Sequence, residues 1–213
     1  RVASGTTTIS FNRPADYQIV VRSGQLSARF AVRFVAPAKS ISIFNSNNAR
    51  LADNALITTT GTKHSLTVIG YSASNETTTL LQASKWSVIS SPDGSSPTFQ
   101  SQGNKTTIQF DRVGLYTLRV TNGSLSRRVR VQVNAALTSL SMDPSSNSLT
   151  SGESRQFNAV ARDQFQQPLA QQPSITWTAT GGSISSTGLY QAGTDPGSFQ
   201  VSARVAKISI STA

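Results

Sequence analysis

The sequence predicts an all-β protein made of tandem β-sandwiches, and three observations lead to that prediction. A pattern of apolar residues recurs along the chain at one fixed offset. Short runs in which apolar and polar residues alternate are separated by turn-forming residues, as in the strands of a sandwich. No stretch combines the 3.6-residue apolar period of an amphipathic helix with helix caps, so essentially no helix is expected.

The repeat is the strongest of the three observations. Thr7–Arg13 (TTISFNR) recurs as Thr106–Arg112 (TTIQFDR), so the offset is 106 − 7 = 99 residues. So many matches without a gap identify a tandem repeat, which indicates repeated structural units. The same offset relates Tyr17 to Tyr116, Ile19 to Leu118, Val21 to Val120, Phe30 to Val129, Val32 to Val131 and Phe34 to Val133.

Each copy of the repeat reads as two strands joined by a turn. Leu118 and Val120 alternate with polar residues before Asn122-Gly123, and Val129 and Val131 alternate with polar residues after it. Alternation on both sides of Asn-Gly predicts a hairpin with a type I′ turn, in which both central residues have positive φ. The valines and leucines are expected to face a core, and the residues between them to face outward.

Three units are expected along the chain. Residues 37–134 and 135–213 each hold one tryptophan, Trp86 or Trp177, and each carries a Gly-x-aromatic-x-aliphatic pattern. We expect both ranges to be complete sandwiches, with each tryptophan at the centre of its core.

Residues 1–36 match only the last strands of a unit. Half a sandwich exposes an apolar face and unpaired strand edges. We therefore expect this segment to be ordered only when it packs on preceding strands of a longer protein, or on strands from a second chain through strand exchange. The apolar set concerned is Ile9, Phe11, Tyr17, Ile19, Val21, Phe30, Val32 and Phe34.

The placement of aromatic residues resembles that of immunoglobulin-like domains. Such domains carry a tryptophan on the third strand and an aromatic residue two positions before a buried cysteine on the sixth; Leu118 and Val201 stand at the cysteine position here. The resemblance implies tyrosine corners at Tyr17 and Tyr116, where the hydroxyl bonds back to nearby backbone, and packing without that bond at Phe199.

Residues 135–213 resemble, in particular, a bacterial immunoglobulin-like domain of the group 2 or invasin/intimin kind. That family usually has Gly at the position of Gln166. Residues 37–134 are similar to polycystic-kidney-disease or cadherin-like modules through Trp86 and the run Phe110…Gly114-x-Tyr116-Thr117-Leu118. The first resemblance is carried by Leu149–Ala159 (LTSGESRQFNA), Ala161–Asp163 (ARD), Ile175–Trp177 (ITW), Gly182–Ser185 (GSIS), Gly188–Tyr190 (GLY) and Gly197–Ala203 (GSFQVSA).

Residues that could carry out catalysis or bind metal are sparse. The chain has no Cys, nine dispersed carboxylates and one His, His64, which we interpret as an ordinary surface or turn residue. Because paired carboxylates, metal-ligand clusters and nucleophile motifs are all missing, we expect no enzyme, no cofactor and no metal site. No apolar run approaches the roughly 20 residues that span a bilayer, so no membrane span is expected.

Positive charge is the one feature that suggests binding. Lys and Arg number 19 against nine acids, for a net charge of +10. The predicted hairpin places Arg119, Arg128 and Arg130 on one outer face, where guanidinium groups could hold phosphate, sulfate or carboxylate. The equivalent strand of the first copy carries Arg29 and Arg33. No aromatic residues interleave with these arginines, so nucleic acid is not the expected ligand.

Three functions fit the sequence. The first is a structural or adhesive module array of a secreted or surface-exposed bacterial protein, a spacer or stalk. The second is a set of accessory modules in a secreted polysaccharide-active or proteolytic enzyme whose catalytic domain lies elsewhere. The third is a module that binds an acidic surface glycan. All three place the chain outside the cell or at its surface, with a protein or a polyanionic glycan as partner.

Overall fold

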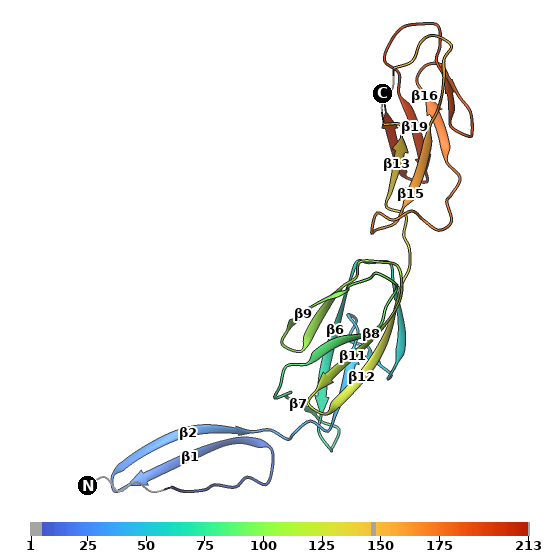
Figure 1. Ribbon diagram of the computed structural model, residues 1–213. Helices are drawn as coiled ribbons and strands as arrows, with labels where there is room; N and C mark the ends of the chain where they lie inside the picture. The colour runs from blue at the N-terminus through green and yellow to red at the C-terminus, as the bar shows by residue number, and fades with distance from the viewer. Residues whose placement is uncertain (1–5, 146–147, 213) are drawn as a thin grey trace.

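The computed structural model describes residues 6–145 and 148–212, and these ranges contain β-strands and no helix. The strands form three units that follow one another along the chain (Figure 1). The first unit is a hairpin, and the middle and third units are each built of facing sheets. The predicted class, an all-β chain of immunoglobulin-like sandwiches, is confirmed.

The middle unit consists of two sheets. One has the strand order β4-β3-β6-β10-β9, with β7 added to β6, and the other has the order β5-β12-β11-β8. Strand β5 runs parallel to β12, and the other pairs are antiparallel. This is the strand arrangement of an immunoglobulin-like sandwich. Its strands are β3 (Ser40–Phe44), β4 (Arg50–Leu51), β5 (Ala55–Thr59), β6 (Lys63–Tyr71), β7 (Thr77–Thr78), β8 (Lys85–Ser90), β9 (Thr98–Gln102), β10 (Lys105–Gln109), β11 (Gly114–Asn122) and β12 (Leu125–Val133).

The core of the middle unit lies between these two sheets. Alternate residues of β11 and β12 are fully buried, as the period-2 pattern predicts. They face alternate residues of β3, β6 and β10, so one continuous apolar cluster fills the unit. The cluster consists of Ile41, Ile43, Leu66, Val68, Ile108, Phe110, Tyr116, Leu118, Val120, Val129, Val131 and Val133.

The hairpin turn differs by one residue from the prediction. Asn122 pairs with Leu125, so Gly123 and Ser124 form the two-residue loop, and of these only Gly123 has positive φ, at 58°. Glycine at the first central position with positive φ is the pattern of a type II′ turn rather than type I′. The prediction of a type I′ turn centred on Asn-Gly is therefore wrong, although the inward and outward parity of both strands is unchanged.

The third unit has the same general arrangement in shorter strands. Strands β16, β19 and β20 form one sheet, and β13-β15 and β14-β18-β17 form the facing layer. Two buried clusters replace the single core: Phe157, Tyr190 and Val201 belong to the larger, and Ala161 and Val205 to the smaller. Its strands are β13 (Ser139–Asp143), β14 (Ser154–Gln156), β15 (Asn158–Arg162), β16 (Thr176–Ala179), β17 (Ser183–Ile184), β18 (Leu189–Gln191), β19 (Val201–Val205) and β20 (Ile208–Thr212).

The two tryptophans are only half-buried, so their predicted central position in each core is wrong. Trp86 lies on β8 and Trp177 on β16, and each of these strands is the edge strand of its sheet. The Trp86 ring stacks on Phe99 with 6.4 Å between ring centroids, at the side of the core cluster. An edge strand has a neighbour on one side only, which agrees with the partial exposure of both tryptophans.

Both predicted tyrosine corners are present. The Tyr116 hydroxyl donates to the carbonyl oxygen of Arg112 at 3.0 Å, and the Tyr17 hydroxyl donates to the carbonyl oxygen of Arg13 at 2.7 Å. Tyr116 is fully buried, and this burial raises the pKa of its hydroxyl. Phe199 lacks the hydroxyl and is half-buried just before β19.

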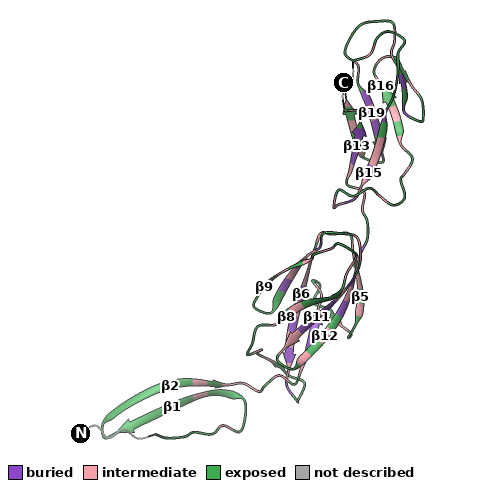
Figure 2. Ribbon diagram, in the orientation of Figure 1, coloured by how far each residue is buried: buried purple, intermediate pink, exposed green. Residues whose placement is uncertain are grey.

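The first unit consists of β1 (Ala15–Ser23) and β2 (Leu26–Phe34), paired in register along their whole length. None of its described residues is buried, as the green and pink ribbon in Figure 2 shows. The hairpin is formed while its apolar face stays open, and packing of this face on preceding strands or on a second chain stays a prediction. Residues 1–5 of the predicted segment lie outside the described residues.

One five-residue turn recurs at the two junctions between units. In the third unit, Asp163 N donates to Gln167 O at 2.8 Å, and Gln166 has a φ of 62°. In the middle unit, Ser72 N donates to Glu76 O at 2.9 Å, and Asn75 again has a φ of 62°. Gln166 therefore holds a left-handed backbone conformation that glycine adopts without strain.

Side chains of the Asp163–Gln167 turn in the third unit contact the middle unit. The Ser72–Glu76 turn in the middle unit has small residues at the same positions. Gln164 Nε2 donates to the carbonyl oxygen of Asn134 at 2.8 Å, and its Oε1 accepts from Ala136 N at 2.8 Å. Phe165 packs against the core cluster of the middle unit. The turn equivalents of Gln164 and Phe165 are Ala73 and Ser74, whose side chains can form neither contact.

Candidate functional site

The three candidate arginines of the middle unit share one outer face. Arg119 on β11 and Arg128 on β12 are direct cross-strand partners, and Arg130 lies two residues further along β12, opposite Thr117. Val129, between Arg128 and Arg130, is fully buried, so the arginine side chains leave the opposite face of the sheet. The structure thus brings the three arginines onto one face, and their binding of a polyanion stays a prediction.

A fourth cation belongs to this face. Lys85 on β8 pairs with Thr121 of β11, and Arg119 pairs with Ser87, so Lys85 lies diagonal to Arg119 on the same side of the sheet. Sequence reasoning missed Lys85 because it considered only the two strands of the hairpin, although the immunoglobulin-like resemblance puts the tryptophan strand in the same sheet. The side of the strand on which Lys85 lies could be predicted from the sequence, because Lys85 immediately precedes the inward-facing Trp86. We call Lys85, Arg119, Arg128 and Arg130 the cationic face.

Among the described residues, no carboxylate forms an ion pair with a side chain of the cationic face. The ion pairs among residues 6–145 and 148–212 are Arg33–Asp16 and Arg155–Glu153, which lie in other units. Asp53 accepts a hydrogen bond from the backbone N of Arg128 at 2.9 Å rather than from its guanidinium. Like charges directly across a strand pair are destabilising, so the Arg119–Arg128 pair is a local cost that a bound anion would relieve.

The two candidate arginines of the first unit have different surroundings. Arg33 forms a two-bond ion pair with Asp16, Nε to Oδ1 at 2.7 Å and Nη2 to Oδ2 at 3.0 Å. These bonds lower the pKa of Asp16 and raise that of Arg33. Arg29 is exposed opposite Val20, the residue equivalent to Arg119. The first unit therefore lacks a cross-strand arginine pair like Arg119–Arg128 of the middle unit.

His64 is half-buried on β6, so its interpretation as a surface or turn residue is wrong. It lies opposite Ile108 in the sheet, and burial lowers the pKa of its imidazole. In the described ranges no group of three or more His, Asp or Glu side chains is placed to hold a metal ion. Across those same residues no helix is long and apolar enough to cross a membrane.

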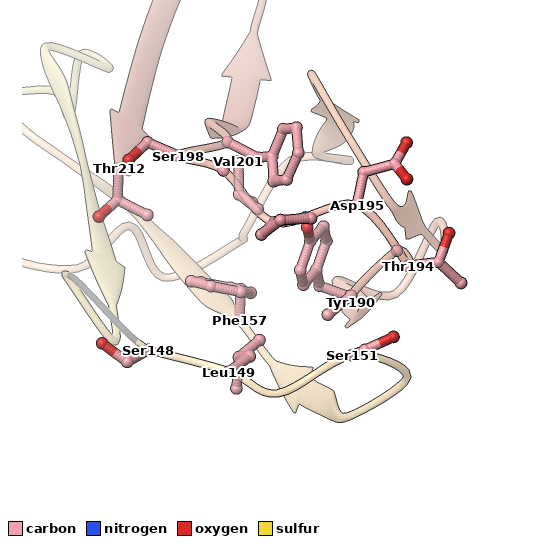
Figure 3. A pocket seen from close by; sticks show the side chains of 15 residues that line it. Ser148, Leu149, Ser151, Phe157, Tyr190, Thr194, Asp195, Ser198, Val201 and Thr212 are labelled. Carbon is pink, nitrogen blue, oxygen red and sulfur yellow. The ribbon is translucent and has the colours of Figure 1, made fainter.

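The third unit contains a cavity of about 410 Å³ that sequence reasoning did not find. It opens between the segment before β14 and the segment that joins β18 to β19. Phe157, Tyr190 and Leu149 line it beside the larger core cluster, while Asp195 and Thr194 lie at another side (Figure 3). Aromatic walls with a few hydroxyl and carboxylate groups are typical of sites that hold small polar molecules with an apolar face.

The position of Phe199 helps to explain this cavity. A Cβ atom on Gly181 would overlap the Phe199 ring, so the ring packs closely on the Gly181 backbone. Strand β19 then begins only at Val201, and the segment before it stays irregular. In the middle unit the equivalent Tyr116 is already inside β11 and fully buried.

No protein-family model and no curated protein sequence matches the chain. Among solved structures, domains 4 and 5 of the S-layer protein SbsC align with 83% of this chain and 97% of that chain, at 13% identity and a TM-score of 0.34. The D0-D1 domain of intimin aligns with 81% of this chain and 96% of its own, at 13% identity and a TM-score of 0.27.

The human Desmocollin-1 ectodomain aligns with 89% of this chain and 43% of its own, at 9% identity and a TM-score of 0.42. At these values the likeness adds nothing on function, and the fold assignment rests on the strand order of the chain itself. The finer resemblances, to group 2 or invasin/intimin-like domains and to polycystic-kidney-disease or cadherin-like modules, stay predictions.

Proposed function

We propose that this chain is a structural or adhesive module array of a secreted or surface-exposed bacterial protein, without catalytic activity of its own. The observation that carries the proposal is the junction between the middle and third units. Gln164 bonds the connecting backbone at both of its amide atoms, and Phe165 packs on the neighbouring core. Two sandwiches joined in this way keep a fixed orientation to each other, as neighbouring modules of a stalk or spacer must.

Two measurements test this function. Antibodies raised against residues 37–212 are expected to detect the protein on intact cells of the source organism or in its culture medium. Detection only after the cells are lysed would contradict the proposal. Replacing Gln164 by Ala and Phe165 by Ser gives this junction the side chains of the other one. We expect residual dipolar couplings to show that the middle and third units then reorient independently, whereas Ala73→Gln in the other turn leaves them unchanged.

A second function, contact with an acidic glycan, is favoured by the cationic face. Arg119, Arg128 and Arg130 gather guanidinium groups that are not ion-paired within the described part of the chain and can bind sulfate or carboxylate bidentately. This proposal is compatible with the first, since a surface array can bind an acidic glycan along its length.

Replacing all three arginines by Gln is expected to abolish retention on a heparin column at moderate salt while thermal stability changes little. The matched control removes the same charge elsewhere, at Arg13, Arg22 and Lys207, and should retain most of the binding. Equal loss in both proteins would show diffuse attraction by net charge rather than a site.

A further inference from the structure

The two copies of the repeat have the same apolar pattern, but the first copy is much less buried than the second. Tyr116, Leu118 and Val120 on β11 are fully buried, whereas in the first copy Tyr17 and Ile19 are half-buried and Val21 is 52% exposed. On the second strand, Val129, Val131 and Val133 are fully buried, and their equivalents Phe30, Val32 and Phe34 are not. The hairpin of the first unit thus exposes to solvent the sheet face that is equivalent to the core-facing side of β11 and β12.

The middle unit shows which strands cover the equivalent face of its own hairpin, β11 and β12. There, Ile41 and Ile43 of β3, Leu66 and Val68 of β6, and Ile108 of β10 cover the inner side of the hairpin. The two outer edges of the hairpin are paired as well. Strand β5 runs parallel to β12 on one edge, and β8 runs antiparallel to β11 on the other.

The residues before the first hairpin carry the sequence of a further strand that has not formed. Thr7–Phe11 is equivalent to the stretch that begins in β10 and ends at Phe110. In the middle unit, β10 is held between β6 and β9. Thr7–Phe11 lies outside the strands of the structure, and its Ile9 is 48% exposed where the equivalent Ile108 is fully buried. A strand needs ladder partners, and in the described first unit no strand besides β1 and β2 is available to pair with it.

We propose that the open face of the first unit is covered by strands equivalent to β3, β5, β6, β8 and β9, supplied by the polypeptide immediately N-terminal to the repeat. In the middle unit the corresponding stretch, from the start of β3 to the start of β10, takes 105 − 40 = 65 residues. With these strands in place, Thr7–Phe11 becomes the strand equivalent to β10, and the first unit is a third immunoglobulin-like sandwich.

A second copy of this chain is a poor occupant for two reasons. The strand set of its middle unit is already covered by its own β11 and β12, whose inner residues are fully buried. The first hairpin also carries Phe30 and Phe34 where that strand set faces Val129 and Val133. Adding side-chain volume to a packed core typically destabilises it. The occupant therefore has smaller side chains opposite these two phenylalanines, and the N-terminal strands of its own module can supply them.

Amide hydrogen exchange of two proteins tests this proposal. One is the chain of residues 1–213, and the other is the natural polypeptide extended by the roughly 60 residues that precede it, because at the 99-residue offset residues 1–5 already correspond to the last five of the 65. Amides of Thr7–Phe11, β1 and β2 are expected to exchange at least ~100-fold more slowly in the extended protein, since buried sheets open far less often than exposed hairpins. Equal exchange in the two proteins would overturn the proposal, as would protection in the 213-residue chain that grows with concentration, the mark of a second copy.

A pair of substitutions in the extended protein completes the test. Ile19→Lys places a charge on the inner face and should remove the protection of β1 and β2. Val20→Lys, its neighbour on the outer face of the same strand, should retain it. Protection that survives Ile19→Lys would show that another surface is covered and would overturn the proposal.

Discussion

The middle and third units share a fold but close their cores differently. In the middle unit, Tyr116 enters β11 already buried, and its hydroxyl bonds to the carbonyl oxygen of Arg112. In the third unit, Phe199 packs on Gly181 outside the strand, the core divides into two clusters, and a cavity of about 410 Å³ remains. An aromatic residue at this position is therefore not sufficient to close the sandwich, and the hydrogen bond of a tyrosine corner fixes where the ring packs.

The tryptophans give the largest expected effect and test whether the two units are independent. Replacing a large buried aromatic by Ala costs about 3–5 kcal/mol, and these half-buried rings are expected near the lower value. Trp177→Ala should lower the melting transition of the third unit only, and Trp86→Ala that of the middle unit only, in differential scanning calorimetry. A joint shift of one common transition would show that the units do not unfold separately.

The tyrosine corner gives the next effect. Tyr116→Phe makes the middle unit resemble the third and removes a hydroxyl bonded in a buried site, so we expect a loss of about 1–2 kcal/mol in free energy of unfolding. Tyr17→Phe removes the same bond from the open hairpin and serves as the control. The transition of the middle unit in urea, followed by Trp86 fluorescence, should respond to the first change and not to the second.

The recurrent turn gives a smaller effect of opposite sign. Gln166 holds a left-handed conformation that costs a non-glycine residue about 1–2 kcal/mol, so Gln166→Gly should stabilise the third unit by about 1 kcal/mol. Asn75→Gly at the equivalent position should gain less in the middle unit, because Asn tolerates this conformation better. Equal gains in both units by thermal melting would contradict the role assigned to backbone strain.

The smallest effect is a pH dependence confined to the middle unit. Burial lowers the pKa of His64 below its unfolded value of about 6.5, so the unfolded chain binds more protons near that pH. The free energy of unfolding of the middle unit should therefore decrease as the pH is lowered from about 7.5 to about 5.5. The third unit contains no His and should not change over this range. His64→Gln should remove the dependence, and a dependence that persists would assign it to another group.

The sequence by itself determined the paired strands of the repeat and the inward residues of its second copy, and the resemblance that it carries gave both tyrosine corners. The inward residues follow from a local rule, since side-chain parity along Leu118 and Val120 has a period of two, whereas the tyrosine corners were implied by the resemblance to immunoglobulin-like domains. Parity also placed Arg119, Arg128 and Arg130 together, because one hairpin connects their strands.

The tertiary structure decided what depends on neighbours distant in the chain. The pairing of β8 with β11 added Lys85 to the cationic face and made Trp86 an edge residue, and no local pattern records that pairing. Phe199 packs on Gly181 at the wall of the cavity, and Phe165 packs against the core of another unit. The same repeat is buried in one copy and open in the other, because burial depends on the strands that lie opposite and not on the residues of the hairpin alone.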